Sequence, residues 1–151
     1  SPECATPGKF FQASSNSCED CPAGKFANAT THATARGSCE ECPAGSFSGP
    51  GENRCWECER GRYATASGSS SCAVCPTGTI GVSRGLTVCV QCSVGKINDD
   101  LAMTDATLHD TADDCEGCGA GKFSSADRTE CTACPSGTFV FNLSSCEYWY
   151  V

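Results

Sequence analysis

The chain has 151 residues and a formal net charge of −8 at neutral pH, with 16 cysteines, 16 glycines and one methionine. The acidic charge argues against nucleic acid or an anionic membrane surface as partners, because both attract clustered Lys and Arg, and no stretch is apolar enough to span a bilayer. Cysteine above about 8–10 % is typical of a disulfide scaffold, and a chain with few large aliphatic residues needs such cross-links to offset its conformational entropy.

Fourteen of the cysteines form seven CxxC pairs, and Cys4 and Cys146 stand alone near the two ends. Cutting the chain inside each pair gives eight tandem repeats, each opening with one cysteine and closing with the next. The predicted repeats are 1–19, 20–40, 41–56, 57–73, 74–90, 91–116, 117–132 and 133–151, and the last includes an aromatic C-terminal cap. Since the chain begins at Ser1 without an apolar signal segment, we expect a mature chain or a fragment.

The repeats open alike. From the second repeat on, the openings are CPAGKF, CPAGSF, CERGRY, CPTGTI, CSVGKI, CGAGKF and CPSGTF; the first repeat has one extra residue. Proline fixes φ and the glycine supplies a turn conformation that other residues rarely adopt. The aromatic or Ile that follows is expected to pack on a disulfide and on the next repeat. The pattern predicts a small disulfide-rich fold: an elongated rod with short β-hairpins and little helix, in which repeats contact only their neighbours.

The cysteine spacing fits disulfides better than metal. Zinc would need two CxxC pairs per site, which seven pairs and two lone cysteines do not divide into naturally, and a redox-active CxxC needs a βαβ setting that is absent from the pattern. The simplest connectivity joins the opening and closing cysteines of each repeat, and an interlaced scheme remains an alternative. The simplest pairs are Cys4–Cys18, Cys21–Cys39, Cys42–Cys55, Cys58–Cys72, Cys75–Cys89, Cys92–Cys115, Cys118–Cys131 and Cys134–Cys146.

The loops contain several candidate sites. Asn28 and Asn142 begin N-glycosylation sequons, so glycans are expected there. His32 and His109 are expected to be exposed loop residues, because neither has a plausible nucleophile as partner. We expect no cofactor.

The sixth repeat is the longest and the most acidic. It contains a weak calcium candidate, formed by Asp99, Asp100, Asp105 and Asp110, although the spacing differs from the twelve-residue calcium loop and a solvated acidic face is the simpler interpretation. Residues 104–110 are expected to form one or two helical turns, with Thr104 as the N-cap.

The chain ends in an aromatic segment. Tyr148, Trp149, Tyr150 and Val151 replace what would be a ninth repeat opening, since position 149 would hold the next cysteine. The segment either caps the last repeat or forms an interface with another subunit, with Tyr148, Trp149 and Tyr150 as the candidate contact residues.

The pattern CPxGxF/Y, a polar loop and then CxxCPxG resembles the ephrin-receptor-like cysteine-rich repeat, which is related to the tumour-necrosis-factor-receptor and growth-factor-receptor modules. In the receptor submodule that the opening resembles, the two cysteines bond to each other, which favours the simplest pairing. Such arrays occur in extracellular proteins of algae and other protists, and the acidic insert between Asn98 and Asp114 is similar to protistan versions. In this sequence Glu59, Ser93 and Gly119 stand where the repeat has proline.

These observations predict a secreted or cell-surface protein that is not an enzyme. The first hypothesis is an extracellular structural glycoprotein, a stiff building block of a fibre or surface coat such as a flagellar hair, which contacts copies of itself or companion extracellular proteins. The alternative is the ligand-binding ectodomain of a receptor or surface antigen. The resemblance is specific for architecture, whereas function depends on the surface that the repeats present.

Overall fold

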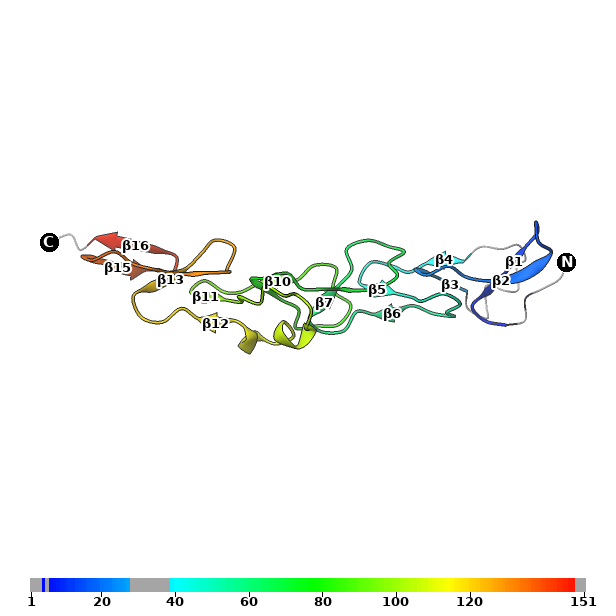
Figure 1. Ribbon diagram of the computed structural model, residues 1–151, viewed down its shortest axis with the longest axis horizontal. Helices are drawn as coiled ribbons and strands as arrows, with labels where there is room; N and C mark the ends of the chain where they lie inside the picture. The colour runs from blue at the N-terminus through cyan, green and yellow to red at the C-terminus, as the bar shows by residue number, and fades with distance from the viewer. Residues whose placement is uncertain (1–3, 5, 28–38, 149–151) are drawn as a thin grey trace. The chain divides into compact units, whose positions relative to one another are not determined.

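The computed structural model describes Cys4, residues 6–27 and residues 39–148, and its regular structure consists of short two-stranded hairpins and two 3-10 helices (Figure 1). Each strand pairs with its neighbour in sequence, from β1 with β2 to β15 with β16. The strands are β1 (Lys9–Gln12), β2 (Ser17–Asp20), β3 (Lys25–Phe26), β4 (Glu40–Glu41), β5 (Ser46–Phe47), β6 (Trp56–Glu57), β7 (Arg62–Tyr63), β8 (Ala73–Val74), β9 (Thr79–Ile80), β10 (Val90–Gln91), β11 (Lys96–Ile97), β12 (Glu116–Gly117), β13 (Lys122–Ser124), β14 (Cys131–Ala133), β15 (Thr138–Phe141) and β16 (Ser145–Tyr148). The helices are η2 (Ala106–Leu108) and η3 (Ala112–Asp114).

Eight disulfides close the repeats, and in each one the opening cysteine bonds the closing cysteine of the same repeat. The pairs are Cys4–Cys18, Cys21–Cys39, Cys42–Cys55, Cys58–Cys72, Cys75–Cys89, Cys92–Cys115, Cys118–Cys131 and Cys134–Cys146. The predicted fold class, a small disulfide-rich chain with short hairpins and little helix, is confirmed. The rod shape stays a prediction.

A tight turn begins each hairpin, and its glycine lies three residues after the opening cysteine, or four in the first repeat. In the second repeat the backbone N–H of Lys25 donates to the carbonyl of Pro22 over 3.0 Å, and Gly24 between them has φ +83°. A positive φ at the third position of a four-residue turn is the requirement of type II, which glycine meets without a steric cost. We call Gly8, Gly24, Gly45, Gly61, Gly78, Gly95, Gly121 and Gly137, all with positive φ, the turn glycines.

Two of the large apolar side chains, Phe47 and Ile80, pack on cystine. Phe47 packs against a cluster that includes Cys58 and Cys72, the disulfide of the following repeat. Ile80 likewise clusters with Cys92 and Cys115. In these two repeats the aromatic or Ile side chain covers the disulfide of the next repeat, which gives a chain with little aliphatic surface a local core.

Main-chain hydrogen bonds join successive repeats. The N–H of each opening cysteine from the second repeat on donates to the carbonyl of the turn glycine before it, over 2.8–2.9 Å. The donors and acceptors are Cys21 to Gly8, Cys42 to Gly24, Cys58 to Gly45, Cys75 to Gly61, Cys92 to Gly78, Cys118 to Gly95 and Cys134 to Gly121. These junctions depend on backbone geometry and not on side-chain identity, so the loops between them can vary.

Six of the turn glycines, Gly8, Gly24, Gly45, Gly61, Gly78 and Gly95, also lie against residues beyond the adjacent repeat. A Cβ placed on Gly45 would lie 2.2 Å from the carbonyl oxygen of Gly85, two repeats along the chain, and one on Gly24 would lie 2.0 Å from the carbonyl oxygen of Gly68. The expectation that repeats contact only their neighbours is therefore wrong. The missing side chain of each of these glycines makes room for the next repeat but one.

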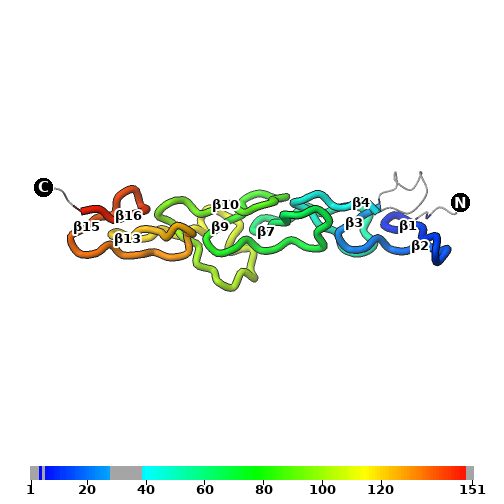
Figure 2. The backbone as a smooth tube through the Cα atoms, turned by 90° about the horizontal axis from the view of Figure 1, so that it is seen from above, coloured from blue at the N-terminus to red at the C-terminus, as the bar shows by residue number. Residues whose placement is uncertain are grey.

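The chain forms two parts. The first comprises 1–59, 63–73 and 84–87, and the second comprises 60–62, 74–83 and 88–151. Within each part the hairpins follow one another in chain order, as the tube in Figure 2 shows. In the second part the loop between β11 and β12 stands out to one side of its neighbours in both views (Figures 1 and 2). Among the helices described, none is long and apolar enough to cross a membrane.

Candidate functional site

The loop of the sixth repeat differs from the others in length and in how it is held. Its disulfide joins residues 23 apart in sequence, whereas the other seven join residues 12 to 18 apart. Both described 3-10 helices, η2 and η3, belong to this loop. We refer to residues 98–114 as the sixth-repeat loop.

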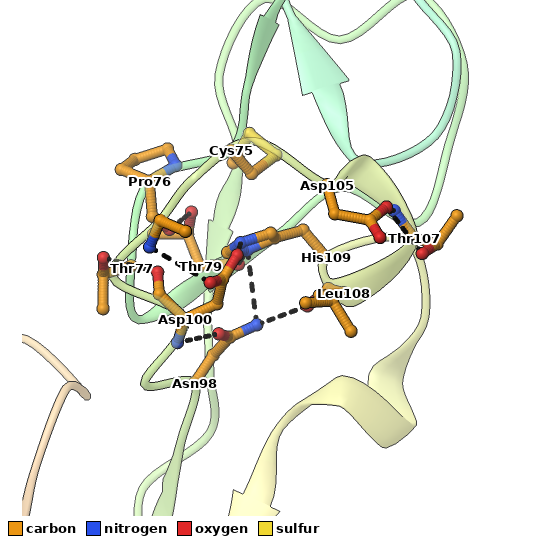
Figure 3. Close-up of polar contacts among 12 residues, drawn as sticks. Cys75, Pro76, Thr77, Thr79, Asn98, Asp100, Asp105, Thr107, Leu108 and His109 are labelled. Atoms are coloured by element: carbon orange, nitrogen blue, oxygen red, sulfur yellow. Dashed lines mark hydrogen bonds and ion pairs between the residues drawn. A yellow bond between two sulfur atoms is a disulfide. The ribbon is translucent and has the colours of Figure 1, made fainter.

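His109 is the buried centre of this loop (Figure 3). Its side chain has no exposed surface, its Nδ1 lies 2.9 Å from the carbonyl oxygen of Thr79, and its Nε2 lies 3.1 Å from Oδ2 of Asp100. The expectation of an exposed loop histidine is therefore wrong for His109. The ring bridges two repeats, because Thr79 belongs to β9 of the fifth repeat, and this is what makes its burial favourable despite its polarity.

Asn98 closes the same cluster from the beginning of the loop. Its side-chain nitrogen donates to the carbonyl of Leu108 over 2.8 Å and lies 3.3 Å from His109 Nδ1. Its side-chain oxygen accepts from the backbone N–H of Asp100 over 3.1 Å. Asn98 is only 4 % exposed, so nearly all of its hydrogen-bonding capacity is used inside the protein. The two ends of the long segment between positions 98 and 109 are thereby tied together.

The cluster is suited to anchoring rather than to reaction. Both ring nitrogens of His109 face oxygen acceptors, the Thr79 carbonyl and the Asp100 carboxylate. Asp100 is itself engaged a second time, because its Oδ1 accepts from the N–H of Ala102. With these atoms already bonded to one another, the arrangement holds the loop against β9.

Asp105 caps the first short helix of the loop. Its carboxylate accepts from the Thr107 hydroxyl over 2.7 Å and from the Thr107 backbone N–H over 2.9 Å. These two hydrogen bonds, the hydroxyl first, lower the pKa of Asp105 below its ordinary value. Helical turns were expected here, but the predicted cap at Thr104 is wrong by one residue. One carboxylate oxygen of Asp105 accepts hydrogen bonds from both the hydroxyl and the backbone N–H of Thr107. A threonine hydroxyl at the cap position carries no charge, so it would accept such hydrogen bonds more weakly.

The calcium candidate gains no support from this geometry. Among the residues that the structure describes, no group of three or more His, Cys, Asp or Glu side chains is placed to hold a metal ion. Two of the four candidate residues have other partners: Asp100 binds His109 and Ala102, and Asp105 caps η2. The two other candidates, Asp99 and Asp110, are exposed and half-buried, respectively.

The anchored loop presents apolar side chains to solvent. Leu101 is 79 % exposed, and Met103 and Leu108 are also exposed. Met103 has φ +46°, which is uncommon for a residue other than glycine. Large apolar side chains on a loop whose ends are fixed by buried hydrogen bonds are a feature of surfaces that contact other proteins.

The remaining candidate residues lie elsewhere. Asn142 lies in the exposed turn between β15 and β16, far in sequence from the sixth-repeat loop, and Tyr148 ends β16 with 66 % of its surface exposed. The structure does not bring these two residues into the His109 cluster. Asn28, His32, Trp149 and Tyr150 lie outside the described residues.

One signal in the sequence marks the buried cluster that sequence reasoning missed. The residue after the aromatic or Ile position is small in the neighbouring repeats, and in the sixth repeat it is Asn98. The small residues at this position are Ala27, Ser48, Ala64, Gly81 and Ser124. The carbonyl at this position accepts from the N–H of the turn glycine of the preceding repeat, as Gly81 does from Gly61 and Ala64 does from Gly45. An asparagine at this position, which faces the preceding repeat, indicates that its side chain is buried.

Comparison with known families supports the repeat architecture. A family model described as tyrosine-protein kinase ephrin type A/B receptor-like matches residues 8–48 and 45–92. The two matches together span residues 8–92, which is more than half of the chain and extends from within the first repeat to the end of the fifth. No curated protein showed significant similarity to the chain. The sixth-repeat loop therefore lies outside the matched region.

Proposed function

The chain belongs to the ephrin type A/B receptor-like family of cysteine-rich repeats, and from that premise we propose that it is an extracellular structural glycoprotein, a building block of a fibre or surface coat. The disulfides and the receptor-like repeats fit an extracellular location. Within this proposal the partners are copies of the chain or companion extracellular proteins, and the chain is not an enzyme.

The observation that carries this proposal is the local closure of every repeat. Across each disulfide the Cα atoms are only 5.5–5.8 Å apart. When the chain is stretched, the shortest covalent path through a repeat crosses its disulfide and then the three residues' length of backbone from the closing cysteine to the next opening cysteine. A fully stretched repeat with its disulfide intact therefore spans about 17 Å. A reduced repeat would reach about 60 Å. The oxidised chain therefore resists extension, which is the property that a fibre or coat requires.

The junctions between repeats favour the same role. Each uses a hydrogen bond from an opening cysteine to a turn glycine, and this bond is repeated seven times. Such bonds tolerate changes in the loops, so the outer surface can adapt to contacts with other subunits. Tyr148, exposed at the end of β16, is the described residue that we propose for such a contact.

The first test is electron microscopy of material from the native source, with antibodies against this chain. We expect labelled filaments or coats in which the chain recurs at a regular interval. Isolated labelled molecules, with no periodic contacts between them, would show that the fibre proposal is wrong. Stretching single oxidised molecules supplies a second test, in which rupture steps close to the 60 Å reach of a reduced repeat contradict the mechanical argument.

A ligand-binding ectodomain is the second candidate, and the sixth-repeat loop favours it. Its apolar side chains, above all Leu101, are exposed on an anchored loop. The test compares binding of the purified chain to native cells before and after the double substitution of Leu101→Ser and Leu108→Ser. If binding is lost while the disulfides and the amide hydrogen-exchange protection of His109 are unchanged, the result supports this function. Unchanged binding rejects the loop as the ligand surface.

A further inference from the structure

The hairpin of the eighth repeat contains a turn with an unusual backbone. β15 and β16 pair with Phe141 opposite Ser145, which leaves three residues in the connecting loop. The N–H of Ser144 donates to the carbonyl of Phe141 over 3.3 Å, and the two residues between them have positive φ, +50° for Asn142 and +58° for Leu143. Positive φ at both central positions is the signature of a type I′ turn, which normally uses Asn or Gly.

This turn is held on its neighbours through Leu143. The Leu143 carbonyl accepts from the N–H of Ser124 over 3.4 Å, and its side chain lies against Gly95, where a Cβ would come within 2.8 Å of the Leu143 Cβ. The left-handed conformation is costly for leucine. The contacts to the sixth and seventh repeats therefore hold this residue in a conformation that it would not adopt in an isolated hairpin.

The same turn is a glycosylation sequon. Asn142, Leu143 and Ser144 match the acceptor pattern, all three are exposed, and Phe141 immediately before them is 42 % exposed. An aromatic ring that is half open to solvent next to an acceptor asparagine can pack against the C–H face of a sugar, because the negative face of the ring attracts weakly positive C–H groups.

We propose that Asn142 carries an N-linked glycan whose first sugar packs on Phe141 and stabilises this turn. The glycan is transferred from a lipid-diphosphate-linked oligosaccharide. The bond that forms joins the Asn142 side-chain nitrogen to the anomeric carbon of the first sugar, and the bond that breaks joins that carbon to a phosphate oxygen of the donor. The amide nitrogen loses one proton, and the lipid diphosphate leaves with the electron pair of the broken bond.

The glycan has a structural consequence because of where it is attached. A bulky sugar on Asn142 that packs on Phe141 stabilises the turn and hence the pairing of β15 with β16, which it joins. We expect packing of the sugar on the ring to slow local opening of the hairpin about two- to tenfold, which is about 0.4–1.4 kcal/mol at 1.4 kcal/mol per factor of ten. The proposal concerns one modified residue and does not depend on whether the protein forms a fibre.

The test uses the full chain secreted by a eukaryotic host. Peptide mass spectrometry before and after enzymatic release of N-glycans is expected to show a glycan on Asn142, absent in Ser144→Ala and retained in the neighbouring control Ser145→Ala. An unmodified Asn142 in the secreted, fully oxidised protein would overturn the proposal. Enzymatic release from the folded wild-type protein avoids any folding defect of a variant.

The packing on Phe141 is tested by amide hydrogen exchange of β16. We expect the glycan to slow this exchange about two- to tenfold in the wild type, compared with the enzymatically deglycosylated protein. In Phe141→Ala, most of this slowing should be absent. An equal slowing in the wild type and in Phe141→Ala would show that the sugar does not pack on the ring, and no slowing in either would show that it does not stabilise the turn.

Discussion

Repeats three to five and the sixth repeat solve the same folding problem in different ways. In the shorter repeats a second glycine in the loop donates its N–H to an opening-cysteine carbonyl of the preceding repeat, from Gly51 to Cys21, Gly68 to Cys42 and Gly85 to Cys58, over 2.7–2.8 Å. In the sixth repeat a buried side-chain cluster around His109 holds the loop instead. The short loops share a main-chain hydrogen bond from their second glycine, whereas the long loop adds a cluster of buried side chains.

The difference follows from loop length. A loop that is closed by a disulfide over 13 or 14 residues has little freedom left, so glycine geometry and main-chain hydrogen bonds suffice. The longer loop of the sixth repeat retains more freedom after closure and needs Asn98, Asp100 and His109 to order it. It still keeps the common stacking, because the His109 carbonyl accepts from the N–H of Gly81 over 2.7 Å, as the Leu86 carbonyl accepts from Ala64.

The largest effect is expected from Gly45→Ala in the main-chain region. The substitution places a Cβ 2.2 Å from the Gly85 carbonyl oxygen at a residue with φ +82°, so steric overlap and backbone strain together should lower the free energy of unfolding by about 4 kcal/mol. Denaturant unfolding of the oxidised protein measures this. Gly49→Ala is the matched control, because its Cβ would meet only ordinary contacts with the Glu52 side chain, 3.8 Å away or more. Equal stability of the two variants would contradict the stacking of alternate repeats.

Removal of one disulfide from each region compares their loops directly. Replacing Cys42 and Cys55 by Ser should cost about 3 kcal/mol, and replacing Cys92 and Cys115 about 0.5 kcal/mol more, because the second loop is longer. Denaturant unfolding of the two double variants gives the difference. A clearly larger loss of unfolding free energy in the variant that lacks the third-repeat disulfide would mean that chain entropy does not distinguish the two loops.

The anchoring role of the buried histidine is tested by His109→Ala. The change leaves the Asp100 carboxylate and the Thr79 carbonyl without their buried partner, which should cost about 2 kcal/mol. Amide hydrogen exchange should show lost protection concentrated in the sixth-repeat loop, with the hairpins of the third repeat unaffected. Leu108→Ala, at an exposed neighbour, is the control and should change stability little. Uniform loss of protection throughout the chain would argue against a local anchor.

The smallest effect concerns the pH dependence of the η2 cap. The hydrogen bonds from Thr107 lower the pKa of Asp105, so its contribution to stability is complete above the ordinary Asp pKa and is lost as the pH falls through the lowered value. Asp105→Asn keeps a capping oxygen but does not titrate. The stability difference between wild type and variant should therefore shrink as the pH falls, which melting curves at several pH values measure. A constant difference would contradict the assignment.

Much of the fold follows from short-range sequence information. The cysteine spacing and the recurring glycine and aromatic residue determine where each hairpin begins, because a turn glycine such as Gly24 admits the positive φ that the turn needs. The family resemblance adds which cysteines bond within a repeat. Asp105 as a cap is also close to what the local sequence predicts, since capping acts within a few residues.

Other features depend on residues that are distant in sequence. That five of the turn glycines lie against backbone of the next repeat but one, as Gly24 does against Gly68, cannot be read from a repeating pattern, because the same pattern fits repeats that touch only their neighbours. The burial of His109 depends on Thr79, thirty residues earlier. The left-handed conformation of Leu143 likewise depends on contacts with Gly95 and Ser124.

The sequence by itself determined the number of repeats, the class of fold and the kind of turn that begins each hairpin, because all three are local consequences of cysteine, proline and glycine. Only the tertiary structure decided which side chains become buried and which stay free to meet a partner. The physical reason is that burial of a polar group such as the His109 ring is favourable only where another repeat supplies the missing hydrogen-bond partners.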